Sequence, residues 1–219
     1  MIDIDEIKIA SGDRPYGEIV EEKSHELTEI LLQDSRSEKF RAIRYAIREM
    51  MRNAVEHSLG QKIVIFGQYW PAREQAEIVI YDTGVGIAST LTDAKIGDGL
   101  SDVELLKVAI MPGVSSVSSA EMDWQNALWK NSGFGLFVTS RFCSKRGVFR
   151  VISGTAGITV NRKTIVDHDW RFDGTCIQMK IDTAHLDEAE KDIHEIISEG
   201  EQLLGGGKTA SKITKSLGA

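Results

Sequence analysis

The sequence is poor in cysteine and contains no long apolar run. Two cysteines, Cys143 and Cys176, occur among its 219 residues, too few for the disulfide framework of a small secreted domain. No uninterrupted apolar segment approaches the roughly 20 residues of a membrane-spanning helix. The acidic residues 1–6 also lack the apolar stretch of a signal peptide. We therefore expect a cytoplasmic protein that works in a reducing compartment and does not enter a membrane.

Positive charge is also scarce. The chain carries 26 lysines and arginines against 33 aspartates and glutamates, for a formal net charge of −7. A dedicated nucleic-acid-binding protein usually presents a basic face, so no direct nucleic acid partner is expected. The proportions of hydrophobic residues (42%) and charged residues (27%) are ordinary for a globular protein. Composition leaves a compact globular protein, and local motifs must indicate what it does.

Hydrophobic periodicity predicts both helices and strands. Apolar residues at three- and four-residue spacing indicate helices over residues 18–32, 37–59, 102–110, 134–146 and 185–204. Runs rich in β-branched and aromatic residues indicate strands at 62–70, 77–82, 148–153, 156–161 and 174–182, and alternation indicates a short strand within 1–11. No regular βαβ repeat occurs. The expected fold class is therefore α+β, a layered sandwich rather than a doubly wound sheet.

Two segments stand apart from this pattern. Residues 83–132 are rich in glycine and serine, and so long a stretch with little regular structure is typical of a lid or a binding loop. Residues 205–219 contain three lysines and no acidic residue, and we expect them to form a flexible tail. The main domain then spans 37–204, and residues 1–36 supply an N-terminal strand and helix that pack on it or extend it.

The first motif with chemical content follows the strand at 77–82. Asp82 ends this apolar strand, and Gly84 and Gly86 follow it closely. The two glycines let the backbone turn sharply and let a flat ligand approach. A carboxylate at this point can accept a hydrogen bond from an exocyclic amine, which is a way to recognise adenine. A hairpin turn capped by an aspartate is the alternative interpretation.

The second motif lies within the helix at 37–59. Glu49, Asn53 and His57 are spaced by four residues, so they form a polar line along one helix face. Asparagine has a poor helix propensity, and Asn53 stands among apolar neighbours. The line is either a functional face or a solvated stripe opposite the core.

Two glycine-containing segments complete the set. Gly133 and Gly135 open the helix at 134–146, where free N–H groups and the positive end of the helix dipole suit a phosphate. Gly174 and Thr175 lead into the last predicted strand. Each segment alone carries little information.

In combination and in this order, the four segments resemble the nucleotide-binding motifs of the GHKL (Bergerat-fold, histidine-kinase-like) ATPases. The resemblance covers residues 37–182 and is closest in style to the anti-sigma-factor serine kinases. It implies a two-layer α/β sandwich. In this fold a mixed, mostly antiparallel sheet is covered by helices on one face, and residues 88–132 form a long ATP lid.

The resemblance also implies roles for individual residues. Asn53 would be a ligand of Mg²⁺, Asp82 would accept from the adenine amine, and Thr175 would lie beside it. Glu49 would be the general base, since a carboxylate near the γ-phosphate can orient a water or a hydroxyl group. The full set expected to bind the nucleotide is Asn53, His57, Asp82, Gly84, Gly86, Ile87, Gly133, Gly135, Leu136, Phe137 and Thr175. A lysine of the lid (Lys95, Lys107 or Lys130) could provide the phosphate contact that gyrase B takes from a following domain.

Three functions are compatible with this resemblance. The first is an ATP-driven switch, in which hydrolysis changes the lid and the state of a protein partner. The second is a serine/threonine protein kinase of the anti-sigma-factor type, acting on a regulatory protein. The third is a non-catalytic module that senses ATP or ADP. All three imply ATP and Mg²⁺ as ligands and a protein partner or substrate, and they allow a homodimer.

Two further segments are similar to functional motifs but depart from them. Residues 24–28 resemble the phosphoacceptor segment of histidine kinases, yet the usual proline is missing. His25 is also too close to Asn53 for the dimerisation helices that separate the two motifs in that family. Residues 205–209 hint at a phosphate-binding loop, but Gln202 stands where that motif requires glycine. We interpret His25 as an ordinary helix residue and residues 205–209 as part of the tail.

Overall fold

The chain folds around one antiparallel sheet. The computed structural model describes residues 2–3, 16–60, 62–116, 132–184, 186–207 and 209–210. The strands are β1 (Ile2–Asp3), β2 (Lys62–Trp70), β3 (Gln75–Asp82), β4 (Gly147–Gly154), β5 (Ala156–Val160), β6 (Ile165–His168) and β7 (Phe172–Asp182). Their order across the sheet is β1-β2-β3-β7-β4-β5-β6. Every strand pair formed by these residues is antiparallel.

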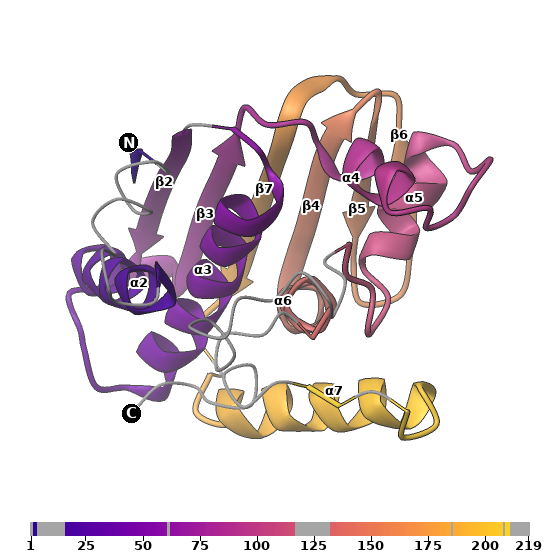
Figure 1. The fold of residues 1–219 in the computed structure, drawn as a ribbon. Coiled ribbons are helices and arrows are strands. Elements are labelled where there is room, and N and C mark those ends of the chain that lie inside the picture. Colours follow the sequence, from indigo (N-terminus) through magenta and orange to yellow (C-terminus); the bar gives the residue numbers. More distant parts are fainter. Residues whose placement is uncertain are drawn as a thin grey trace.

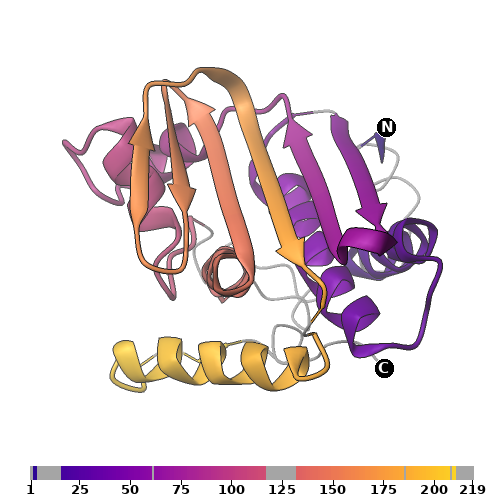
Figure 2. The same ribbon diagram turned by 180° about the vertical axis from the view of Figure 1, so that it is seen from behind.

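The helices form a second layer on one face of this sheet. They are α2 (Tyr16–Leu32), α3 (Glu38–His57), α4 (Ile87–Asp93), α5 (Asp102–Ala109), α6 (Gly135–Lys145) and α7 (Ala189–Leu203), with a short 3₁₀ turn η1 (Pro71–Arg73) between β2 and β3. Figure 1 shows α3 and α6 lying in front of the sheet, α2 beside β2, and α7 crossing below the two helices. From behind, no described helix covers the opposite face of the central strands (Figure 2). The expected two-layer α+β sandwich is therefore confirmed, with an antiparallel sheet in place of a mixed one.

Most predicted elements are present near their predicted bounds. The hairpin of β2 and β3 pairs Ile63 with Asp82 and Trp70 with Gln75. The long helix begins at an N-cap serine, whose Ser37 hydroxyl oxygen accepts from the Phe40 N–H at 3.1 Å. The structure adds α4 and β6, which periodicity did not predict. Of the strand expected within 1–11, Ile2–Asp3 pair with β2, and residues 4–11 lie outside the described part of the chain.

The alternation of side chains along β3 explains how the sheet positions a polar group. Ala76, Ile78, Ile80 and Asp82 all face the helices and are buried, because alternate residues of a strand share one face. Asp82 thus occupies a core-facing position, whereas the other core-facing positions of the strand hold apolar side chains. This places a carboxylate beneath α3 at the end of β3.

The N-terminal helix shares the core of the main domain. Ile19, Val20 and Leu32 of α2 are buried in the same hydrophobic cluster as residues of α3 and the sheet. Both cysteines are free; Cys143 is buried and Cys176 is half-buried. The boundaries proposed at 36 and 204 stay predictions, and most of the expected tail lies outside the described residues. No helix in the described ranges is both long and apolar enough to span a membrane.

Candidate nucleotide-binding site

A cavity lies between the helical layer and the sheet. Its volume is about 780 Å³ when the solvent at its open mouth is included. One wall comes from α3, the floor from the ends of β3 and β7, and the remaining sides from α4, α5, the segment 114–116 and the start of α6. The lining residues are Met50, Asn53, Ala54, His57, Ser58, Ile80, Asp82, Gly86, Ile87, Thr90, Leu91, Ala109, Val114, Ser115, Ser116, Gly133, Leu136, Thr175 and Ile177. Nine of these residues are apolar, eight are polar and two are glycine, and no described lysine or arginine lines the cavity.

Asp82 is the acidic side chain of the cavity floor. It is 6% exposed, and this burial raises its pKa to about 6, although N–H donors from Gly84 and Thr175 act in the opposite direction. The Gly84 N–H donates to Asp82 Oδ1 at 2.8 Å, and Thr175 is the direct cross-strand neighbour of Asp82. The carboxylate is thus held by backbone donors at the edge of the cavity.

The glycines after β3 are required by close backbone approaches. A Cβ on Gly84 would overlap the backbone carbonyl of Ser58, at the C-terminus of α3. The same carbonyl accepts from the Val85 N–H at 2.7 Å. Gly86 has φ of +84°, and a Cβ there would lie 2.7 Å from Ser153 Oγ. These contacts fasten the turn after Asp82 to the end of α3 and to β4.

Ser153 on β4 does not line the cavity but supports two segments that do, a role that the sequence motifs did not predict. Its Oγ accepts from the Ile87 N–H at 2.8 Å and donates to the Gly174 carbonyl at 2.8 Å. It is fully buried and joins the start of α4 to the turn before Thr175. A signal was present in the sequence, because Phe149, Val151 and Ser153 occupy alternate, core-facing positions of one strand, and a serine there needs a polar partner.

Asn53 and His57 form the α3 side of the cavity. Both side chains line it, which follows from their spacing of one helical turn. Burial, with a further effect of nearby Arg52, lowers the pKa of His57 to about 4, so this imidazole is neutral at pH 7. His57 Nδ1 lies 3.2 Å from the Ser116 hydroxyl oxygen. The α3 wall therefore offers an amide and a neutral imidazole rather than a cation.

The remaining side contains the start of α6. The first helical hydrogen bond runs from the Val138 N–H to the Phe134 carbonyl at 2.8 Å, so the N–H groups of Gly135, Leu136 and Phe137 precede the helical ladder. Just before them, the Gly133 carbonyl accepts from the Gly113 N–H at 3.0 Å. Gly133 has φ of +73°, and a Cβ there would overlap the Gly113 backbone. The hydrogen bond between Gly113 and Gly133 therefore brings the two ends of the intervening segment together.

Glu49 lies outside the cavity lining. Its side chain is fully buried, with Oε1 2.9 Å from Arg48 and Oε2 3.0 Å from Arg52. A Cβ on Gly135 would overlap Oε2, so the carboxylate packs against the first turn of α6. The predicted base therefore sits behind the wall of the cavity, next to the helix start, and is held there by two arginines.

The structure brings most of the predicted nucleotide-binding residues together. Eight of them line the cavity: Asn53, His57, Asp82, Gly86, Ile87, Gly133, Leu136 and Thr175. Glu49, Gly84, Gly135 and Phe137 do not line it. Phe137 is buried in the hydrophobic core, where its ring packs edge-on against Phe134. Gly84 and Gly135 act through the close backbone approaches described above.

The proposed lid is described only in part. Its α4, α5 and residues 114–116 line the cavity, whereas 117–131, with Lys130, lie outside the described residues. Lys107 points elsewhere, since its Nζ pairs with Asp167 of β6 at 2.7 Å. Lys95 is exposed and does not line the cavity.

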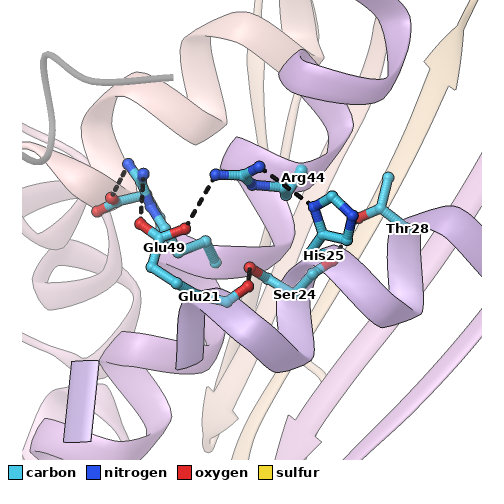
Figure 3. Close-up of polar contacts among 7 residues, drawn as sticks. Glu21, Ser24, His25, Thr28, Arg44 and Glu49 are labelled. Atoms are coloured by element: carbon cyan, nitrogen blue, oxygen red, sulfur yellow. Dashed lines mark hydrogen bonds and ion pairs between the residues drawn. The ribbon is translucent and has the colours of Figure 1, made fainter. Parts of the chain in front are cut away.

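His25 is placed as an ordinary residue of α2. Its ring packs edge-on against Phe40 of α3 at a centroid distance of 5.0 Å, and Nδ1 lies 3.4 Å from a guanidinium nitrogen of Arg44 (Figure 3). The neighbouring Ser24 and Thr28 are buried and donate to backbone carbonyls of their own helix. This segment belongs to the packing of α2 on α3.

The cavity lining offers few oxygen ligands for a metal ion, chiefly the Asn53 amide and the Asp82 carboxylate. Within the described ranges, no group of three or more histidine, cysteine, aspartate or glutamate side chains could hold a metal by itself. Mg²⁺ does not require such a cluster, because it is commonly bound by one or two protein oxygens together with substrate phosphates and water. The Asn53 amide oxygen on the cavity wall fits that limited role.

Comparison of the sequence with models of known protein families gives no match, and comparison with curated proteins gives none either. The functional interpretation consequently depends on the geometry of the cavity and on the motifs themselves.

Proposed function

We propose that this protein binds Mg²⁺·ATP in the cavity between α3 and the sheet and hydrolyses it. The observation that carries the proposal is Asp82, a buried carboxylate on a cavity floor that also contains the apolar Ile80 and Ile177. A flat, apolar ring with one exocyclic amine suits such a floor, since burying an ionised carboxylate is costly unless it receives hydrogen bonds. Adenine has this shape and this donor.

A nucleotide also needs a place for its phosphates, and Asn53 and the start of α6 are suited to bind them. The N–H groups ahead of the helical ladder and the helix dipole favour an anion. Asn53 would hold Mg²⁺, which when bound neutralises phosphate charge. His57 is neutral and would act as a hydrogen-bonding group beside the phosphates.

The chemical step assigned to Glu49 is proton removal from water. The water oxygen bonds to the γ-phosphorus while Glu49 takes the water proton, and the bond from the γ-phosphorus to the bridging oxygen breaks. ADP leaves with that electron pair, and inorganic phosphate is the second product. Because Glu49 is packed behind the first turn of α6, its carboxylate must turn toward the cavity for this step.

The test is to incubate the protein with γ-labelled Mg²⁺·ATP and to follow free phosphate and labelled protein together. Asp82→Asn should weaken ATP binding about 10- to 100-fold, as expected for loss of a hydrogen bond to a buried charged group. Asp173→Asn, the same substitution at an exposed position of β7, is the matched control. Label on a polypeptide would assign a kinase instead, and ATP binding without turnover a sensor. Equal ATP affinity in wild type and Asp82→Asn would refute the site.

Nucleotide affinity should depend on pH through Asp82. With a pKa near 6, the carboxylate is ionised at pH 8 and only about one tenth ionised at pH 5. The ionised form accepts from the adenine amine, so the affinity for ADP should fall about tenfold between these pH values. Isothermal titration of wild type and Asp82→Asn in the same buffers checks this, because protonation of the ligand affects both proteins alike. A parallel pH dependence in the two would contradict the role of Asp82.

A further inference from the structure

A buried network of six charged side chains joins α2 to α3 around Glu49. It contains Glu21 on α2 and, on α3, Arg44, Arg48, Glu49, Arg52 and Glu56. Three carboxylates balance three guanidinium groups, and the side chains of Arg48, Glu49 and Arg52 are each at most 1% exposed. Figure 3 shows Glu21 reaching from α2 toward Arg44 of α3.

Each arginine that holds Glu49 also contacts a second carboxylate. Arg48 is 2.9 Å from Glu49 Oε1 and 2.9 Å from Glu21 Oε1, through different nitrogens. Arg52 is 3.0 Å from Glu49 Oε2 and 3.7 Å from Glu56 Oε1. Glu21 itself also reaches Arg44 at 3.2 Å. The two arginines are therefore shared between the predicted base and two other carboxylates.

This sharing matters because Glu49 must leave its arginines to act. A buried guanidinium that loses its carboxylate is strongly unfavourable, so release of Glu49 requires that Arg48 and Arg52 keep another acidic partner. Glu56 stands one helical turn from Arg52 on the same helix. Glu21 comes from another helix and would serve Arg48.

We propose that Glu21 is a positioning residue for Glu49. Glu21 keeps Arg48 paired with a carboxylate when the Glu49 carboxylate turns into the cavity. This inference rests on the proposed function, because it assumes that Glu49 acts on bound nucleotide. It makes the catalytic state of α3 depend on α2, a helix that contributes no residue to the cavity lining. Any movement of α2 away from α3 would leave Arg48 on Glu49 and hold the base out of the cavity.

The test compares Glu21→Gln, Glu21→Asp and Glu26→Gln in the full chain. Glu26 lies on the same helix, but its carboxylate is 58% exposed and pairs with Lys23, so Glu26→Gln is the matched control. Turnover of ATP, the dissociation constant for ADP and the melting temperature are measured for each protein. Glu21→Gln should lower kcat at least tenfold with an ADP affinity within twofold of wild type. Glu21→Asp, which keeps the charge, should recover most of kcat, and Glu26→Gln should match wild type.

The possible outcomes separate the two hypotheses. If wild type turns over ATP and Glu21→Gln does so equally fast, the positioning role is wrong and the proposed function stands. If Glu21→Gln loses kcat and ADP affinity together, or if Glu21→Asp fails to recover kcat although it melts like wild type, Glu21 is structural only. If wild type neither binds nor turns over ATP, the proposed function fails and the positioning role fails with it.

Discussion

Glu49→Gln should abolish most ATP turnover while leaving nucleotide binding intact. General-base catalysis by a positioned side chain contributes about 10²- to 10⁴-fold, and a glutamine cannot take the proton from water. Because Glu49 does not line the cavity, the dissociation constant for ADP should stay within a few-fold of wild type. Phosphate release at saturating Mg²⁺·ATP, with ADP binding measured by calorimetry, checks both parts.

The same substitution removes a buried charge that pairs with two arginines. Breaking such a buried pair typically costs about 3–5 kcal/mol of stability, so the melting temperature of Glu49→Gln must be measured and turnover assayed well below it. Asp82→Asn should give the opposite pattern, with weak binding and turnover that recovers at high ATP concentration. A Glu49→Gln protein that stays folded and releases phosphate at the wild-type rate would remove Glu49 from the mechanism.

Gly84→Ala should strongly destabilise the fold. The added Cβ would overlap the Ser58 carbonyl oxygen, and both atoms belong to backbone or are fixed to it, so no side-chain rotation relieves the overlap. Overpacking of this kind costs about 3 kcal/mol or more, which corresponds to a fall in melting temperature of roughly 10 °C for a chain of this size. Thermal unfolding followed by circular dichroism provides the measurement.

Gly207→Ala is the control for that substitution. The nearest atom to a Cβ on Gly207 is the Leu204 carbonyl oxygen at 3.5 Å, an ordinary contact, so its melting temperature should equal that of wild type. If Gly84→Ala also melts like wild type, then the turn after Asp82 is not packed on the end of α3 as the structure has it.

Sequence patterns predicted the core elements because a helix or strand with one buried face has apolar residues at regular spacing. Alternation in β3 marks Asp82 as a core-facing position, and helical spacing marks the face of α3 that carries Asn53 and His57. The short, surface elements show no such spacing. All four residues of β6 are at least partly exposed, and α4 has seven residues with few buried side chains, so neither shows a clear period.

The location of Glu49 could not be derived from its spacing. Helical periodicity places Glu49 on the same face as Asn53, yet it does not state whether its carboxylate enters the cavity or pairs with neighbours. That depends on Arg48, Arg52 and the close approach of Gly135, and the last is a contact between elements far apart in the sequence. For Ser153 the strand pattern marks a core-facing polar position, but its partners lie on two other segments and cannot be derived from that pattern.

The hydrogen bond from the Gly113 N–H to the Gly133 carbonyl brings together the two ends of the connection between α5 and α6. Lengthening such a connection is inexpensive, since each doubling of a flexible loop costs only about 0.6 kcal/mol of closure entropy. We therefore expect a change in the length of this connection beyond residues 114–116, which line the cavity, to leave the cavity floor around Asp82 and Thr175 in place.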